Sequence, residues 1–203
     1  FFANASHELK TPLTAIKGFN DLTAINNKDE NLNKYIEKID RETNRMLSLI
    51  SDMLRLSELE NTRALSPSPV KLRDICIEVN ELLADKIREE NISVEISGDS
   101  TVNAEYKHMY ELIKNLFENA VLYNRKNGSV NIRITDSDNY AILKVSDSGS
   151  GISPSDQSRI YERFYRADKS RSRKNGGTGL GLSIVKHICN LYSADITLRS
   201  KQG

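Results

Sequence analysis

Ser6-His7-Glu8-Leu9-Lys10-Thr11-Pro12-Leu13 lies near the start of the chain, where the first of two long helices is expected. A neutral imidazole is a good nucleophile at neutral pH, because its unperturbed pKa is about 6.5. Glu8 is placed to polarise or deprotonate His7, and Thr11 shares a helix face with Glu8. Pro12 removes a backbone donor and is expected to bend the helix just past the histidine. An ordinary helix start with a surface histidine would show the same residues. The rest of the chain is therefore needed to choose between a nucleophilic His7 and a surface His7.

The next stretch predicts a second helix that pairs with the first. Residues 1 to about 25 have a helical apolar pattern, 26–29 form a polar turn, and a longer helix is expected over 31–60. Heptad spacing in this second helix connects Ile36, Ile39, Thr43, Met46, Ile50, Met53 and Ser57. A hairpin alone cannot bury so wide a stripe, so two hairpins are expected to pair as a dimeric four-helix bundle. The alternative is a hairpin that packs on its own second domain.

Composition limits the classes of partner. The 203 residues include 38% hydrophobic and 28% charged residues, with a net charge of +1. This balance gives no strong attraction to nucleic acid or to a membrane surface. No apolar run approaches the roughly 18 residues of a membrane span. Cys76 and Cys189 both lie in helix-like apolar patterns, so they are expected to be reduced core residues of a cytoplasmic domain.

A linker separates the hairpin from a second domain. Ser66-Pro67-Ser68-Pro69 cannot continue a helix, because proline does not fit a helix interior. The sequence therefore predicts a hairpin over 1–65, a linker over 66–70 and a second domain over 71–203. In the second domain, helices are expected at 72–87, 106–123 and 180–192, a helix start at 153–156, and strands around 92–96, 130–134, 140–146 and 196–198. This mixture predicts an α/β sandwich of the α+β class, with one sheet covered by helices.

Two features of the second domain suit a nucleotide and its metal ion. Asn115 and Asn119 lie one turn apart on one edge of an apolar helix, and their amide oxygens suit a hard cation such as Mg²⁺. Asp147 is in phase with apolar residues of its strand, so its carboxylate is expected to be buried and to need a partner such as a base amine. Gly149 and Gly151 let a ligand approach the backbone. Surface amides and an ordinary strand-end turn remain the alternatives.

A glycine-rich stretch leads into the last helix. Gly176-Gly177-Thr178-Gly179-Leu180-Gly181-Leu182 would expose backbone N–H groups at a helix N-terminus, where phosphate binds. It matches neither the dinucleotide pattern nor a P-loop. Upstream, the segment 159–166 mixes arginines, including Arg163, with aromatic residues in an expected helix. Arginine suits phosphate, although a solvated helix face gives the same pattern. Residues 166–177 are basic and polar, which predicts a mobile loop.

The order of these signals resembles the sequence boxes of bacterial sensor histidine kinases. The matching stretches are His7 to Pro12, Asn115 to Asn119, Asp147 to Gly151, Tyr161 to Phe164, and Gly177 to Gly181. The resemblance covers essentially all 203 residues. It implies a dimerisation and phosphoacceptor hairpin, followed by a catalytic ATP-binding domain of the Bergerat type, which is shared with DNA gyrase and heat-shock chaperones. Leu122 is a departure, because family members commonly carry a lysine just before the tyrosine at Tyr123.

The resemblance also implies roles for individual residues. It makes His7 the autophosphorylated histidine, Glu8 its acid/base partner, and Arg163 and Thr11 further catalytic residues. Asn115 and Asn119 are implied to form the magnesium side of an ATP site, and Asp147 to read adenine. The remaining nucleotide-binding residues implied are Tyr123, Gly149, Gly151, Gly177, Thr178, Gly179, Leu180 and Gly181, with 166–177 as the ATP lid.

The activity implied is that of an ATP-dependent protein-histidine kinase. The γ-phosphoryl group of Mg·ATP would pass to His7 and then to an aspartate on the receiver domain of a response regulator. Glu8-Leu9-Lys10-Thr11 is similar to a pattern linked to dephosphorylation of that regulator. The implied partners are a second copy of the chain and the regulator, with no nucleic acid, and a membrane only through segments outside these residues.

Two alternatives remain. One is an ATPase of the gyrase or chaperone class, which uses a glutamate base where Asn115 stands; an amide cannot take a proton from water. The other is a dimerisation module without kinase activity.

Overall fold

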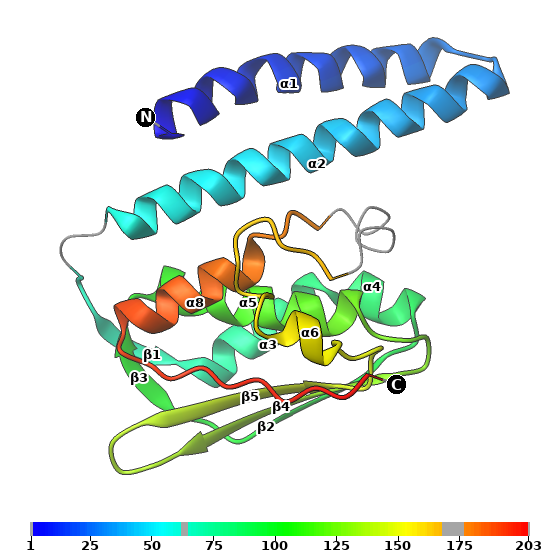
Figure 1. Ribbon diagram of the computed structural model, residues 1–203. Helices are drawn as coiled ribbons and strands as arrows, with labels where there is room; N and C mark the ends of the chain where they lie inside the picture. The colour runs from blue at the N-terminus through cyan, green and yellow to red at the C-terminus, as the bar shows by residue number, and fades with distance from the viewer. Residues whose placement is uncertain (1, 62–64, 168–176, 203) are drawn as a thin grey trace. The chain divides into compact units, whose positions relative to one another are not determined.

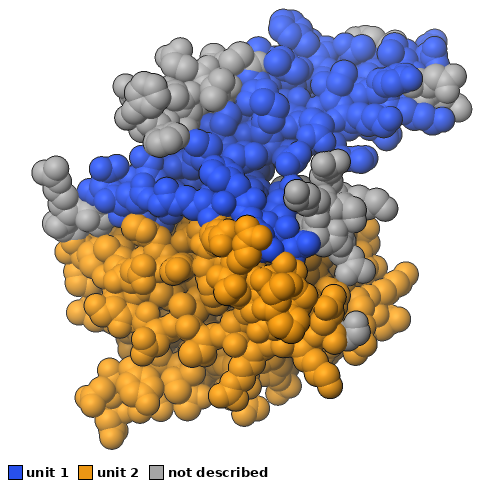
Figure 2. Space-filling model, viewed as in Figure 1, with its two compact units in different colours: residues 1–61, 163–180 blue, residues 62–162, 181–203 orange. Residues whose placement is uncertain are grey.

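A computed structural model describes the backbone of residues 2–61, 65–167 and 177–202. Side chains are described over the same ranges, except those of residues 2–12, 26, 30 and 31. The chain divides into two compact units (Figure 2). The first unit comprises residues 1–61 and 163–180, and the second comprises residues 62–162 and 181–203.

The first unit is built on a helical hairpin, as the sequence predicts. Helix α1 (Phe2–Asn26) and helix α2 (Glu30–Glu60) lie side by side and are joined by a tight turn (Figure 1). α1 continues past Pro12. Asn20 Nδ2 donates to the carbonyl of Ile36 at 2.8 Å, which ties the two helices together across a buried amide. The buried hydrophobic residues of the hairpin are Leu13, Ile36, Ile50, Leu56 and Leu59.

The second unit is a layered α/β structure. Its elements in chain order are β1 (Ser68–Lys71), α3 (Leu72–Leu82), α4 (Ala84–Glu89), β2 (Ser93–Ser97), β3 (Thr101–Ala104), α5 (Tyr106–Leu122), β4 (Ser129–Asp136), β5 (Ala141–Asp147), α6 (Pro154–Gln157) and α8 (Gly181–Leu191). β2 pairs with β4 in parallel, β4 pairs with β5 antiparallel, and β1 pairs with β3 in a separate antiparallel sheet.

Helices cover one face of the three-stranded sheet, and α5 packs between α3 and α8 (Figure 1). The inward side chains of α3, α5, β4 and α8 are almost fully buried, namely Ile75, Ile113, Phe117, Ile132, Ile184 and Ile188. Both cysteines are free and buried, which confirms their predicted place in the core. Burial raises the pKa of the Cys76 thiol to about 11, so this thiol is an inert packing group.

Several predictions about secondary structure are wrong in detail. Residues 68–70, expected within the linker, form strand β1 together with Lys71; Pro69 is tolerated there because a short edge strand does not need every N–H. The helix expected over 72–87 is broken at Leu83 into α3 and α4. Residues 196–198, expected as a strand, lie in irregular backbone. Close by, the N–H of Ile152 donates to the side chain of Ser200 at 2.9 Å rather than to a backbone carbonyl.

The mixed helix expected over 159–166 is also absent. The chain leaves α6 at Gln157 and continues in turns. Phe164 has a φ of +64°, which a right-handed helix cannot contain, and its N–H donates to the carbonyl of Gly179 at 2.9 Å. Most of the expected mobile loop, residues 168–176, lies outside the described residues.

Among the helices that the structure describes, none combines the length and the hydropathy that a membrane span requires.

Candidate nucleotide-binding site

Helix α5 carries the two asparagines that the sequence singled out. Its apolar face buries Ile113 and Phe117 completely, so Asn115 and Asn119 are left half-buried at its edge. Asn115 Nδ2 donates to the carbonyl of Glu111 at 2.8 Å. This bond fixes the side-chain amide and turns its oxygen, Oδ1, away from the helix backbone.

The glycine-rich stretch meets this oxygen. Gly181 is the first residue of α8, and a Cβ atom on Gly181 would lie 2.5 Å from Oδ1 of Asn115. Glycine is therefore required here by a close approach between α8 and a side chain of α5. The contact joins two of the predicted nucleotide-binding stretches, and the backbone N–H groups of the first turn of α8 lie beside it.

The Asp147 loop meets the end of the same helix. The N–H of Gly149 donates to Asp147 Oδ1 at 2.9 Å, and the N–H of Ser150 donates to the carbonyl of Tyr123 at 3.4 Å. A Cβ atom on Gly149 would lie 2.5 Å from the Tyr123 carbonyl oxygen, so this approach also requires glycine. The expectation that Asp147 is buried is wrong: the residue is exposed at the last position of β5.

Gly151 completes this loop. Its φ is +69°, a left-handed conformation that glycine adopts without strain. A Cβ atom there would also clash with the carbonyl of Lys201.

Asn124 and Ser148 support the loop, and the sequence analysis missed both. Ser148 Oγ donates to Asn124 Oδ1 at 3.1 Å and accepts from the N–H of Ser129 at 2.8 Å. Asn124 Nδ2 lies 3.0 Å from the carbonyls of Ala120 and of Ser129. Asn124 lies just past the end of α5, where a side-chain amide commonly bonds to the last helix carbonyls. Its position in the sequence could therefore have indicated this supporting role.

The other predicted phosphate-loop residues belong to the first unit. Thr178 Oγ1 donates to Asp52 Oδ2 at 2.6 Å and accepts from the N–H of Leu180 at 3.2 Å. Gly179 has a φ of +77°, and Gly177 precedes it in irregular backbone. Arg163 forms an ion pair with Glu60 at the end of α2.

His7, Glu8 and Thr11 lie on α1, in keeping with the helix predicted for them. Their side chains are outside the described residues.

The donor set of the second unit fits Mg²⁺ held mainly by nucleotide and water. Among the described residues there is no group of three His, Cys, Asp or Glu side chains that could hold a metal ion by itself. Mg²⁺ usually takes only one or two protein oxygens alongside substrate phosphates. The fixed Oδ1 of Asn115, beside the start of α8, has the chemistry that such a ligand needs.

Fold and site together define a class of protein. An α/β sandwich carries paired asparagines, a strand-end Asp147 loop and Gly181 at the start of α8, and these features are grouped around one helix, α5. This is the arrangement of a Bergerat-type ATPase domain, here preceded in sequence by a helical hairpin.

Comparison with protein families and relatives identifies the family. Residues 104–203 match the family "Histidine kinase-, DNA gyrase B-, and HSP90-like ATPase", and residues 1–62 match the "His Kinase A (phospho-acceptor) domain". The sensor histidine kinase RppB of Synechocystis sp. is 34% identical over 216 residues, covering 100% of this chain and 46% of RppB. The sensor-like histidine kinase SenX3 of Mycobacterium tuberculosis is 34% identical over 209 residues, covering 100% of this chain and 50% of SenX3.

Solved structures agree with these relatives. Full-length ShkA in complex with AMPPNP has a TM-score of 0.73 at 26% identity, covering 93% of this chain and 40% of that one. ThkA in complex with the response regulator protein TrrA has a TM-score of 0.59 at 28% identity, covering 81% and 49%. The chain belongs to the bacterial two-component sensor histidine kinase family. It spans about half the length of the curated relatives it matches.

Proposed function

We propose that this chain is the kinase part of a sensor histidine kinase, which binds Mg·ATP and phosphorylates its own His7. The observation that carries the proposal is the close approach of Gly181 to Asn115, which places the start of α8 on the asparagine helix. The family match and the kinase relatives support the same activity.

The proposed chemistry needs one nucleophile and one proton acceptor. A neutral imidazole nitrogen of His7 attacks the γ-phosphorus, an N–P bond forms, and the P–O bond to ADP breaks. Glu8 accepts the imidazole proton. Bound Mg²⁺ would neutralise charge on the phosphates, held from the protein side by the oxygens of Asn115 and Asn119.

The same site offers groups for binding the adenine base and the phosphates of ATP. The exposed Asp147 carboxylate is available to accept a hydrogen bond from the adenine amine, beside a backbone that Gly149 and Gly151 leave open. Backbone N–H groups from Gly177 to Gly181 are proposed to bind the phosphates at the N-terminus of α8. Tyr123 would line the site from the end of α5, and Arg163 would add positive charge during transfer.

We also propose a homodimer through the hairpin. Several large apolar side chains remain exposed on α1 and α2, including Phe19 at 70%, Ile25 at 80%, Ile39 at 47% and Met46 at 49%. Ile39 and Met46 belong to the heptad pattern. A stripe of this kind is buried when two hairpins form a four-helix bundle.

The proposed partner is the receiver domain of a response regulator. An aspartate there would take the phosphoryl group from His7, and Thr11 would position a water for the reverse reaction, dephosphorylation of the regulator. The similarity to ThkA, solved with the regulator TrrA, supports this class of partner. We place the chain on the cytoplasmic side of a sensor whose membrane segments lie outside these residues.

Incubation of the purified chain with γ-labelled ATP tests the proposal. A kinase gives acid-labile label on the protein, an ATPase of the gyrase class gives free phosphate, and a silent dimerisation module gives neither. Acid-labile protein label is expected; either other result would overturn the proposal.

A further inference from the structure

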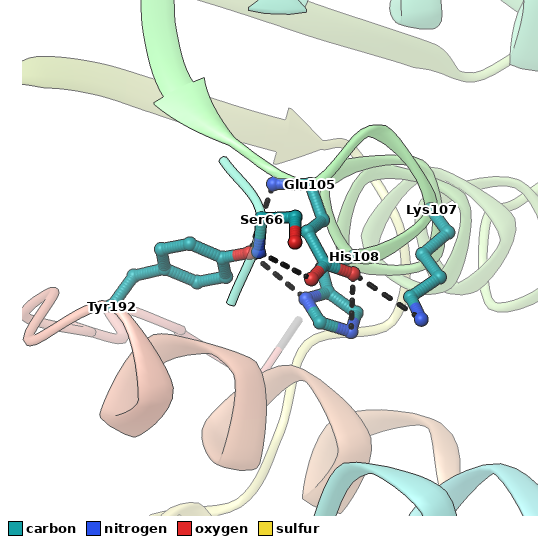
Figure 3. Close-up of polar contacts among 5 residues, drawn as sticks. All are labelled: Ser66, Glu105, Lys107, His108 and Tyr192. Carbon is teal, nitrogen blue, oxygen red and sulfur yellow. Dashed lines mark hydrogen bonds and ion pairs between the residues drawn. The ribbon is translucent and has the colours of Figure 1, made fainter. Parts of the chain in front are cut away.

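A polar cluster lies at the end of α5 away from the asparagine pair. Its members come from the stretch before β1, from the start of α5 and from the end of α8 (Figure 3). They are Ser66, Glu105, Lys107, His108 and Tyr192. None of these five residues lies within a stretch that resembles a kinase box, and the proposed chemistry gives them no role.

Glu105 occupies the N-cap position of α5 but does not cap the helix with its side chain. Its Oε1 accepts instead from the backbone N–H of Ser66 at 3.0 Å, and its Oε2 lies 3.2 Å from Lys107 Nζ. The hydrogen bond from Ser66 lowers the pKa of Glu105, with Lys107 acting in the same direction. The carboxylate is therefore ionised at neutral pH and directed at the linker.

The bond to Ser66 extends the β1–β3 ladder where the backbone cannot. The register places Ser68 opposite Ala104, so Pro67 would face Glu105 next. Proline has no N–H to donate, and the ladder must stop there. Ser66 offers the next donor along the chain, and the Glu105 side chain reaches it in place of a backbone carbonyl.

The Tyr192 side chain connects the start of α5 to the end of α8. The N–H of Glu105 donates to the Tyr192 hydroxyl at 2.9 Å, and the same hydroxyl lies 2.9 Å from Nδ1 of His108. Nε2 of His108 lies 3.7 Å from the Glu105 carboxylate, which favours the ring proton on Nε2. The hydroxyl proton then goes to Nδ1, so one phenol oxygen joins the start of α5 to the end of α8.

We propose that Glu105 is a positioning residue that latches the linker to the second unit, with Tyr192 and His108 holding the latch on α5 and α8. These two helices carry Asn115, Asn119 and Gly181. When the latch is closed, the chain leaves the second unit at Ser66. When it opens, the chain leaves at Ser68, which adds up to about 7 Å of reach.

The free length of the linker determines how often the nucleotide site lies in line with His7. A longer tether lowers the fraction of time in which the site and the histidine are aligned, while the site itself is unchanged. The latch therefore acts on the rate of phosphoryl transfer and not on nucleotide affinity. This kinetic consequence rests on the proposed function; the latch itself does not.

Three substitutions isolate the latch. Glu105→Ala removes the acceptor. Ser66→Pro removes the donor from the other side. Glu105→Gln keeps an oxygen in place and should rescue the latch. Lys107→Ala is the matched control, because it removes the exposed partner of the same carboxylate and leaves the bond to Ser66 intact.

The measurements are amide exchange at Ser66, the Kd for Mg·ATP, and the autophosphorylation rate at saturating ATP. We expect Glu105→Ala to speed exchange at Ser66 about 10-fold or more. The rate should fall about 3-fold or more with the Kd within about 2-fold of wild type. Ser66→Pro should match the rate loss, while Glu105→Gln and Lys107→Ala stay near wild type.

Two results would overturn the inference. Unchanged exchange at Ser66 in Glu105→Ala would show that there is no latch. A lower melting temperature with an unchanged rate per folded molecule would show a structural role alone. A wild-type chain that takes up no label would refute the proposed function, whereas exchange at Ser66 decides the latch in either case.

Discussion

Gly181→Ala places a methyl group between α8 and α5. The new Cβ atom would lie 2.5 Å from Oδ1 and 3.4 Å from Cγ of Asn115. Side-chain atoms do not approach this closely, so the Asn115 amide must rotate away. Its hydrogen bond to the Glu111 carbonyl, now 2.8 Å, is lost in that movement.

Gly181→Ala should change the free energy of unfolding little and the affinity for Mg·ATP more. Losing the Asn115 hydrogen bond removes about 1 kcal/mol of stability. Replacing a mid-helix glycine with alanine returns roughly 0.5–1 kcal/mol, which is an upper bound for Gly181 because it is the first residue of α8. The free energy of unfolding should therefore change by less than about 1 kcal/mol. Because Asn115 is the proposed magnesium ligand, displacing its amide should weaken Mg·ATP binding about 10-fold, or about 1.4 kcal/mol.

Titration with Mg·ATP by calorimetry, together with thermal unfolding, checks both numbers. Gly18→Ala is the matched control, because a Cβ atom on Gly18 meets nothing within 4 Å. It should stabilise α1 by roughly 0.5–1 kcal/mol and leave the Kd unchanged. An unchanged Kd in Gly181→Ala would refute the argument that this glycine and Asn115 share the nucleotide site.

Three further predictions test the core, the base contact and the acid response. Phe117→Ala should lower the free energy of unfolding by about 3–5 kcal/mol in denaturant titration, because the ring is fully buried; a loss under about 1 kcal/mol would contradict that packing. Asp147→Asn should reduce the preference for ATP over GTP in competition binding, because an amide oxygen is a weaker acceptor than a carboxylate; an unchanged preference would remove Asp147 from base recognition. The pKa of Glu105 lies below its ordinary 4.5, so its stabilising effect is complete above that pH and is lost as the pH falls through the lowered value. Urea unfolding from pH 6 to pH 3 should show a shallower decline in Glu105→Gln than in wild type, and parallel curves would exclude this contribution.

Local patterns were sufficient for much of the fold. The 3–4 spacing of apolar residues predicted α1 and α2, and alternation predicted β2, β4 and β5. β1 and β3 were missed because each has only four residues, and Pro69 in β1 looks like a linker residue. Their pairing is a tertiary contact that neither strand indicates alone.

In the candidate site, too, local sequence predicted some features, while others depend on tertiary packing. The spacing of Asn115 and Asn119 was visible in the sequence, but the approach of Gly181 to Asn115 depends on how α8 packs on α5. The turn at Phe164 was not predicted, because its positive φ is imposed by the contact with Gly179 rather than by residue type. The Glu105–Tyr192 bond joins residues 87 positions apart and has no local signature.

The most direct test of the central claim is the fate of label from γ-labelled ATP in His7→Gln. The chain has 3 histidines, so His187→Gln is a natural control for a non-specific loss of activity. The account predicts that His7→Gln takes up no acid-labile label while it binds Mg·ATP as wild type does, and that His187→Gln labels normally. Acid-labile label at the wild-type level in His7→Gln would contradict the account.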